Sequence, residues 1–140
     1  LNIAACSLGG AQAATDAAIA YMKERSAFGK HLTGFQALQF EVADMVTQLE
    51  ISRTFLRRAA SALDAGAADA PTLCAMAKRF VTDSCFEVAD KALQLHGGYG
   101  YLSEYGVEKI VRDLRVHQIL EGTNEIMRVI IARQALGGAA

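Results

Sequence analysis

The chain has 140 residues, of which 52% are hydrophobic and 7% aromatic, and its formal net charge is −1. A chain of this length can bury one sizeable core, so we predict a single domain over residues 1–140. The near-zero charge and the lack of a basic run argue against a nucleic-acid partner, and no apolar run reaches the roughly 20 residues that span a bilayer.

The first half of the chain predicts two helices, because apolar residues recur there at three- and four-residue steps. An alanine-rich helix covers about 2–25 and stops before Gly29, which can terminate a helix. After a short loop, a long amphipathic helix covers about 35–65.

The second half predicts two further helices and one less regular segment. Pro71 suits the first turn of a helix that runs to Leu95, just before a glycine-rich stretch. Residues 103–120 predict a short helix and a turn, and the last helix covers about 123–136. Nothing alternates convincingly with period two, and short connections make neighbouring helices antiparallel. The expected fold is therefore all-α, an antiparallel up-and-down four-helix bundle.

Three cysteines, Cys6, Cys74 and Cys85, occur in apolar stretches. They form no Cys-x-x-Cys pair, and the histidines show no metal-ligand spacing. We interpret the cysteines as reduced thiols in the core, and we predict no metal site.

The segment HQILEGTNEIMR sets Glu121 just before the last helix. Thr123 and Asn124 offer capping oxygens, and the free N–H groups of a helix start suit an anion or a polar cofactor. Ile119 and Leu120 are expected to desolvate Glu121 and raise its pKa from about 4.3 toward neutrality, as a general base requires. On spacing alone, a solvated residue before an N-cap is the commoner explanation of Glu121.

Two other stretches can contact a ligand. QLHGGYG is a helix end followed by a tight turn whose bare backbone can approach a ligand, although a plain C-cap is the commoner explanation. In RSAFGKHLTGFQ, Arg25 can reach a phosphate or simply complement the helix dipole. Phe28 can stack on a planar ring, and Gln36 carries both a donor and an acceptor.

Together these stretches resemble the C-terminal domain of the acyl-CoA dehydrogenase family. The resemblance rests on Arg25-Ser26-Ala27-Phe28-Gly29 with Phe35-Gln36 downstream, on QLHGGYGY, and on RDLRVHQILEGTNEIMR. It runs essentially from end to end of the chain. Within the family, the segments SLGGAQA and MAKRF are most similar to the isobutyryl-CoA dehydrogenase branch.

The resemblance implies a chemistry for Glu121. It would remove the α-proton of an acyl-CoA thioester while the β-hydrogen leaves as hydride to FAD, giving a 2-enoyl-CoA. A thioester α-proton is only weakly acidic, so a suitable base and a polarised carbonyl are both needed. Some family members carry the base on the first helix of this domain. Residues 1–15 contain no Asp or Glu, which leaves Glu121 as the candidate.

The resemblance also implies binding residues and partners. The residues expected to contact FAD across a subunit boundary are Arg25, Phe28, Phe35, Gln36, Gln94, Gly97 and Gly98. Thr123, Asn124 and Glu125 would face the FAD of their own subunit, and Arg133 the CoA part of the substrate. The implied partners are an acyl-CoA, an electron-transferring flavoprotein and further copies of the chain in a homotetramer.

The family's N-terminal helical domain and middle β-domain have no counterpart in these 140 residues. We therefore expect a fragment that folds, at least as an oligomer, and has little or no dehydrogenase activity by itself. Its expected location is a bacterial cytoplasm or a mitochondrial matrix. Two alternatives stay open: an acyl-CoA oxidase-like enzyme, in which oxygen reoxidises the flavin, and a helical oligomerisation module without chemistry.

Overall fold

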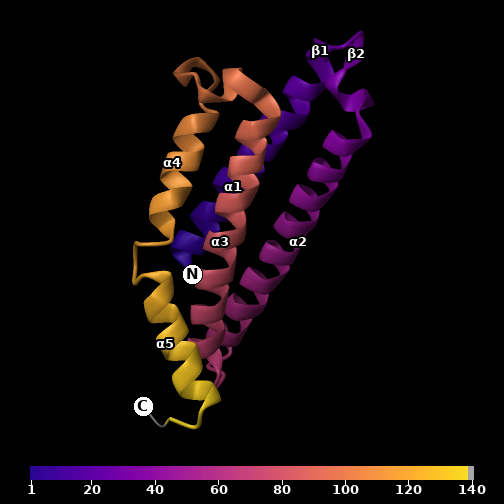
Figure 1. The fold of residues 1–140 in the computed structure, drawn as a ribbon. Helices are drawn as coiled ribbons and strands as arrows, with labels where there is room; N and C mark the ends of the chain where they lie inside the picture. The colour runs from indigo at the N-terminus through magenta and orange to yellow at the C-terminus, as the bar shows by residue number, and fades with distance from the viewer. Residues whose placement is uncertain (139–140) are drawn as a thin grey trace.

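The structure is a computed structural model of the chain, and it describes residues 1–138. Within these residues the helices are α1 (Asn2–Glu24), α2 (Gln36–Asp64), α3 (Ala70–His96), α4 (Val107–His117) and α5 (Asn124–Ala135). Figure 1 shows α2 running antiparallel to both α1 and α3, with α4 and α5 descending along the remaining side. The predicted all-α, up-and-down bundle is confirmed.

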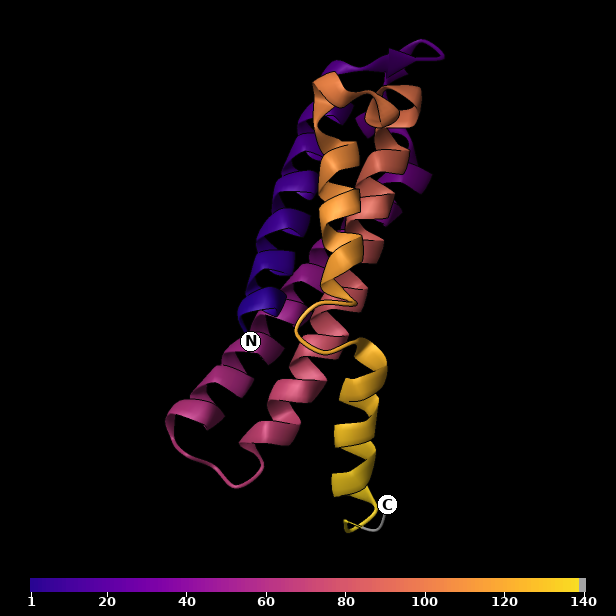
Figure 2. The ribbon, with the colours of Figure 1, turned by 90° about the vertical axis from the view of Figure 1, so that its left-hand side faces the viewer.

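The fourth side of the bundle agrees with the short helix and turn expected for residues 103–120. The structure has the 3₁₀ turn η3 (Ser103–Tyr105), then the 11-residue α4, and a turn after His117. Gly106 begins α4 with a φ of 70°, which a side chain would resist. Figures 1 and 2 show α4 and α5 end to end, so this side is broken only at 118–123.

A small hairpin joins α1 to α2 where a plain loop was expected. β1 (Ser26–Ala27) pairs antiparallel with β2 (Lys30–His31), and η1 (Leu32–Gly34) leads into α2. Phe28 and Gly29 form the turn with φ values of 51° and 82°. Positive φ at both central residues is typical of a tight two-residue hairpin turn, which explains why glycine follows phenylalanine here.

α3 is the central helix and packs against α1, α2, α4 and α5. Small side chains allow α1 to approach it closely: Ala4, Ala11, Ala14 and Ala18 are fully buried. At Gly10 an added Cβ would lie 2.6 Å from Leu114 Cδ1, so a larger residue where α1 crosses α4 would have to displace the Leu114 side chain. At its other end, α3 continues into the 3₁₀ turn η2 (Gly97–Tyr101).

The prediction that all three cysteines are core thiols is wrong for Cys6, which is exposed, and only partly right for Cys74. Cys85 is buried among the core side chains, and burial raises the pKa of its thiol to about 12. In residues 1–138 no helix is long and apolar enough to cross a membrane. The same residues contain no metal-binding group of three His, Cys, Asp or Glu side chains.

Candidate active site

Glu121 lies in the connection that breaks the fourth side of the bundle, between α4 and α5. The turn begins at the end of α4, where the N–H groups of Ile119 and Leu120 both donate to the carbonyl oxygen of Val116. Glu121 has a φ of 56° and Gly122 a φ of 89°. Among residues 1–138, Glu121 and Phe28 are the only non-glycine residues with positive φ. Such a conformation costs about 1–3 kcal/mol and persists only where surrounding contacts enforce it.

The start of α5 follows directly and has the capping that the sequence predicts. Thr123 is the N-cap, and its Oγ1 accepts a hydrogen bond from the Ile126 N–H at 3.4 Å. Glu125 stands in the first turn, fully exposed. Hydrogen bonds from its own backbone N–H and from Thr123 lower the pKa of Glu125. An anionic Glu125 suits the positive end of this helix.

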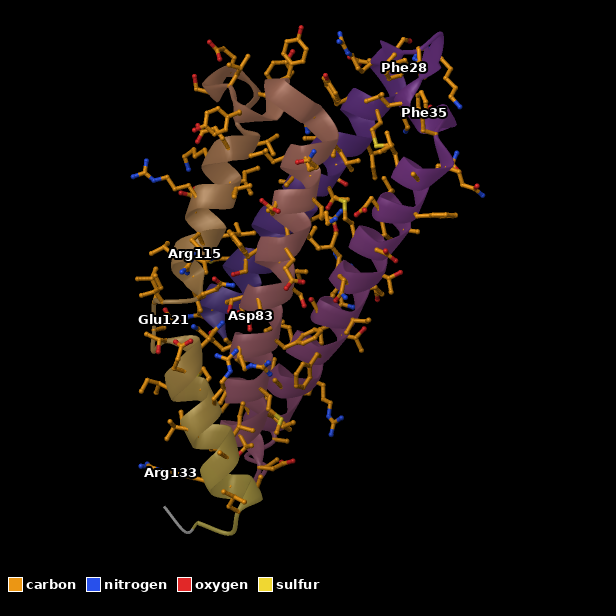
Figure 3. The ribbon with its side chains drawn as sticks, in the orientation of Figure 1. Phe28, Phe35, Asp83, Arg115, Glu121 and Arg133 are labelled. Atoms are coloured by element: carbon orange, nitrogen blue, oxygen red, sulfur yellow. The ribbon has the colours of Figure 1, made fainter. Side chains whose placement is uncertain are left out.

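The Glu121 side chain is exposed rather than enclosed. Ile119 and Leu120, which were expected to desolvate it, are themselves 51% and 43% exposed. The prediction of a dry environment is therefore wrong for the residues that the structure describes, because both apolar neighbours turn outward with Glu121. Figure 3 shows Glu121 at the outer edge of the break between the two helices.

A lysine from the central helix reaches under this connection. Lys78 of α3 is 4% exposed, and its Nζ donates to the carbonyl oxygens of Gly122 at 2.8 Å and Gln118 at 3.4 Å. It also donates to Asn124 Oδ1 at 2.7 Å. Burial lowers the pKa of Lys78, and the carboxylates of Asp83, Glu121 and Glu125 oppose that effect.

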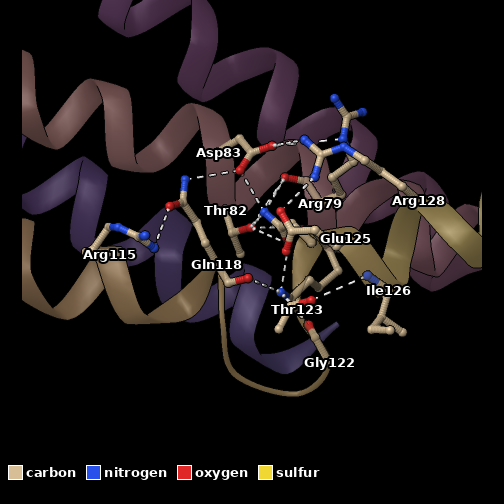
Figure 4. A network of polar contacts seen from close by, with 12 residues as sticks. Arg79, Thr82, Asp83, Arg115, Gln118, Gly122, Thr123, Glu125, Ile126 and Arg128 are labelled. Carbon is tan, nitrogen blue, oxygen red and sulfur yellow. Dashed lines mark hydrogen bonds and ion pairs between the residues drawn. The ribbon is translucent and has the colours of Figure 1, made fainter.

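Asn124 joins the same network from the first turn of α5. It is 3% exposed, and its Nδ2 donates to Asp83 Oδ1 at 2.6 Å and to Thr82 Oγ1 at 2.9 Å. Gln118 Nε2 donates to the same Asp83 oxygen at 3.1 Å (Figure 4). The Asn124 backbone N–H donates to the Gln118 carbonyl at 3.0 Å. Within the described chain Asn124 serves the connection itself, and its contact with a cofactor stays a prediction.

The second group of predicted residues lies at the hairpin end of the bundle. A hollow of about 450 Å³ between α1 and the end of α3 is lined by Arg25, Gln94, Gly97 and Gly98, together with aromatic and apolar side chains. The Arg25 guanidinium carbon stands 5.4 Å from the centre of the Tyr99 ring. An added Cβ at Gly98 would meet nothing within 4 Å, so this backbone is open to a ligand.

The remaining predicted residues do not line that hollow. Phe28 is 96% exposed at the hairpin turn, with its ring 6.4 Å from that of Phe35, and Gln36 is exposed at the start of α2. Arg133 is exposed near the end of α5, away from Glu121 (Figure 3). The structure therefore brings Arg25 together with the glycine turn, and it separates both from Glu121 along the length of the bundle.

Sequence reasoning missed Lys78 and the aromatic side chains around the hollow. Tyr21 stacks on the buried His96 ring at 4.6 Å between centroids, and Tyr105 meets both rings edge-on. A signal for Lys78 existed: it precedes Val81 by three residues and Cys85 by seven. These spacings put a lysine on the buried face of a predicted helix.

Comparisons with known proteins agree with this architecture. Residues 1–136 match the model of the acyl-CoA dehydrogenase C-terminal domain. The chain is 53% identical to mitochondrial isobutyryl-CoA dehydrogenase of Bos taurus over 136 residues, which cover 97% of the chain and 33% of that protein.

Solved structures give the same result. Butyryl-CoA dehydrogenase of Megasphaera elsdenii superimposes with a TM-score of 0.92 at 40% identity, covering 96% of this chain and 35% of that one. The FAD complex of PigA superimposes with a TM-score of 0.88 at 32% identity, with the same coverage of both chains. The chain thus spans about a third of the length of the relatives that it matches. On its sequence and on its fold, this chain belongs to the acyl-CoA dehydrogenase family and corresponds to that family's C-terminal domain.

Proposed function

We propose that the chain is the base-carrying domain of an FAD-dependent acyl-CoA dehydrogenase, with Glu121 as the catalytic base. One observation carries the proposal: a carboxylate in a costly positive-φ conformation, on a connection that buried side chains hold in place. A residue that only solubilised the surface would need neither the conformation nor the support. The chain's likeness to acyl-CoA dehydrogenases supplies the reaction.

In this reaction Glu121 accepts the α-proton of the acyl thioester on one carboxylate oxygen. FAD, when bound, accepts the β-hydrogen as hydride. Glu121 projects from the domain, so the remainder of the enzyme must exclude water from around it. For this reason we propose that residues 1–140 alone have little or no dehydrogenase activity. Arg133, exposed on α5, is proposed to contact the CoA part of the substrate.

The hollow at the hairpin end is our candidate for contacts with FAD. Arg25 offers a cation, Gln94 an amide, and Gly97 and Gly98 open backbone, which together suit a polar, phosphate-containing cofactor. A structural neighbour, PigA, is known as an FAD complex, which supports FAD as the cofactor. Phe28, Phe35 and Gln36 lie outside the hollow and are proposed to reach the cofactor from the hairpin side.

Thr123, Asn124 and Glu125 lie far along the bundle from this hollow, so one FAD would not meet both groups of the same chain. We propose that each group serves a different FAD in a homotetramer. Exposed apolar side chains on α2 and α5, such as Ile51, Leu63 and Ile126, are 48–53% exposed and suit contact with other copies or domains. An electron-transferring flavoprotein is the proposed electron acceptor. A bacterial cytoplasm or a mitochondrial matrix is the proposed location.

The test is Glu121→Gln in the complete native polypeptide that contains residues 1–140, loaded with FAD. Flavin reduction by short acyl-CoA thioesters, isobutyryl-CoA among them, should slow about 10²–10⁴-fold, the usual contribution of a general base. FAD content and thermal midpoint should stay close to those of the unmodified protein. Glu87→Gln makes the same chemical change at an exposed position of α3 and should leave the rate unchanged. Unaltered flavin reduction in Glu121→Gln would favour a non-catalytic module.

A further inference from the structure

We infer that Lys78 is the positioning residue for the catalytic base: its buried ammonium group holds the backbone on both sides of Glu121. This inference rests on the proposed function of Glu121. Lys78 does not act on the substrate itself, because it is 4% exposed and lies beneath the connection rather than beside the exposed carboxylate.

The geometry of the ammonium group supports this role. Its three N–H donors have three oxygen acceptors: the Gly122 carbonyl at 2.8 Å, Asn124 Oδ1 at 2.7 Å and the Gln118 carbonyl at 3.4 Å. Two of these acceptors bracket Glu121, one residue after it and three residues before it. A single buried point on α3 therefore ties down both arms of the turn that carries the base.

The buried Lys78 ammonium group must be compensated by nearby negative charge, and this connects it to the rest of the polar network. Burying an ammonium group is costly unless carboxylates or oriented carbonyls compensate it. Asp83, five residues further along α3, provides a nearby carboxylate and also receives hydrogen bonds from Gln118 and Asn124. The end of α4, the start of α5 and the centre of α3 are thus fixed by one set of polar contacts (Figure 4).

A connection between two helices does not by itself require a buried charge, since a methionine of similar shape could fill the same space. The conformation of Glu121 provides the reason for one. A non-glycine residue at a φ of 56° relaxes toward ordinary conformations unless its neighbours prevent it. Reaction rates fall steeply when a base moves by about 1 Å, so we assign to Lys78 the accurate placement of the Glu121 carboxylate.

The test compares Lys78→Met with Lys78→Gln, which keeps part of the donor capacity, in the complete FAD-loaded protein. Val88→Ala is the matched control, because it weakens the core on the same helix without touching the connection. The single-turnover rate of flavin reduction is measured per bound FAD at saturating acyl-CoA, so that loss of folded protein does not count. Hydrogen exchange of the peptide covering residues 117–126 reports on the connection without relying on activity.

Lys78→Met should slow flavin reduction per bound FAD by about 100-fold, with Lys78→Gln in between, while the substrate concentration at half-saturation changes little. Exchange at 117–126 should accelerate in both variants. Val88→Ala should lower the thermal midpoint but leave the rate per bound FAD and the exchange of this peptide unchanged. The inference is overturned if both Lys78 variants react at the normal rate, or if Val88→Ala slows the reaction as much. If Glu121→Gln is fully active, the proposed function fails instead.

Discussion

Ser7 Oγ of α1 lies 2.8 Å from His117 Nδ1, in the last turn of α4. The same hydroxyl donates to the Ile3 carbonyl oxygen at 2.9 Å, so its single hydrogen is already used. His117 must then donate through Nδ1–H, which fixes the tautomer of the neutral ring. This contact ties the first helix to the residue that ends α4, four positions before Glu121.

This relationship makes stability depend on pH. Burial lowers the pKa of His117 below its usual 6.5, and the Lys78 cation adds to the effect, while the carboxylates of Asp113 and Glu121 oppose it. Between the folded-state pKa and 6.5, the unfolded chain therefore binds more protons than the folded one. Stability is complete above about pH 6.5 and falls as the pH drops through the folded-state pKa.

We predict that His117→Gln reduces this loss of stability. Glutamine can still donate to Ser7 Oγ but does not titrate, so the thermal midpoint should fall less between pH 7.5 and 5.5 than in the unmodified protein. The two proteins should be compared at both pH values by thermal unfolding in the same buffer. Parallel decreases in the two midpoints would contradict a role for His117.

The backbone at Glu121 leads to a second prediction. At a φ of 56°, glycine avoids the steric cost that any residue with a Cβ experiences. Glu121→Gly should therefore be more stable than Glu121→Ala by about 1 kcal/mol. Both variants lack the carboxylate, so both should be inactive. Urea unfolding of the two variants, followed by far-UV circular dichroism, measures the difference.

Because neither variant has the carboxylate, the difference in stability between Glu121→Ala and Glu121→Gly reports on the backbone conformation at position 121. Equal stability of the two variants would mean that the conformation at 121 carries no strain. An alanine variant more stable than the glycine variant would mean the same. Either result would weaken the argument that function, rather than folding, retains a side chain at this position.

Most of the fold could be predicted because it depends on local pattern. Leu38, Val42, Met45 and Leu49 recur at helical spacing, and in α2 the last two are buried. The break at 118–123 and the cap at Thr123 are also local, and both appear where the sequence predicts them. The short helix expected within 103–120 is present as α4, but its start could not be located from an apolar repeat, since it depends on the backbone of Gly106.

The site could be predicted only in part because its contacts join distant segments. Lys78 lies 44 residues before the Gly122 carbonyl that it binds, and no local pattern reveals such a pairing. The outward orientation of Ile119 and Leu120 is equally invisible in the sequence, since apolar residues next to a carboxylate can cover it or turn away with it. Cys6 shows the same limit: an apolar stretch does not specify which face of α1 a thiol occupies.

Two glycines of the turn after α3 lie in different surroundings: Gly98 is open to a ligand, whereas Gly100 is packed against the end of α3. An added Cβ at Gly100 would lie 2.5 Å from the Leu93 carbonyl oxygen and 2.9 Å from His96 Cβ, whereas at Gly98 it would meet nothing within 4 Å. Gly100→Ala should therefore destabilise the protein by about 1–3 kcal/mol through overpacking. Gly98→Ala should leave the thermal midpoint unchanged.

For FAD affinity the expected order is reversed: Gly98→Ala should weaken FAD binding more than Gly100→Ala does. If the open backbone at Gly98 contacts the cofactor, a methyl group there should raise the dissociation constant of FAD by about tenfold, equivalent to ~1.4 kcal/mol. Equilibrium dialysis of the complete protein, after removal and re-addition of FAD, measures this constant. Unchanged FAD affinity in Gly98→Ala would remove Gly98 from the cofactor site. A loss of affinity would point to the cofactor and not to packing, because an added Cβ at Gly98 meets no atom of the chain within 4 Å.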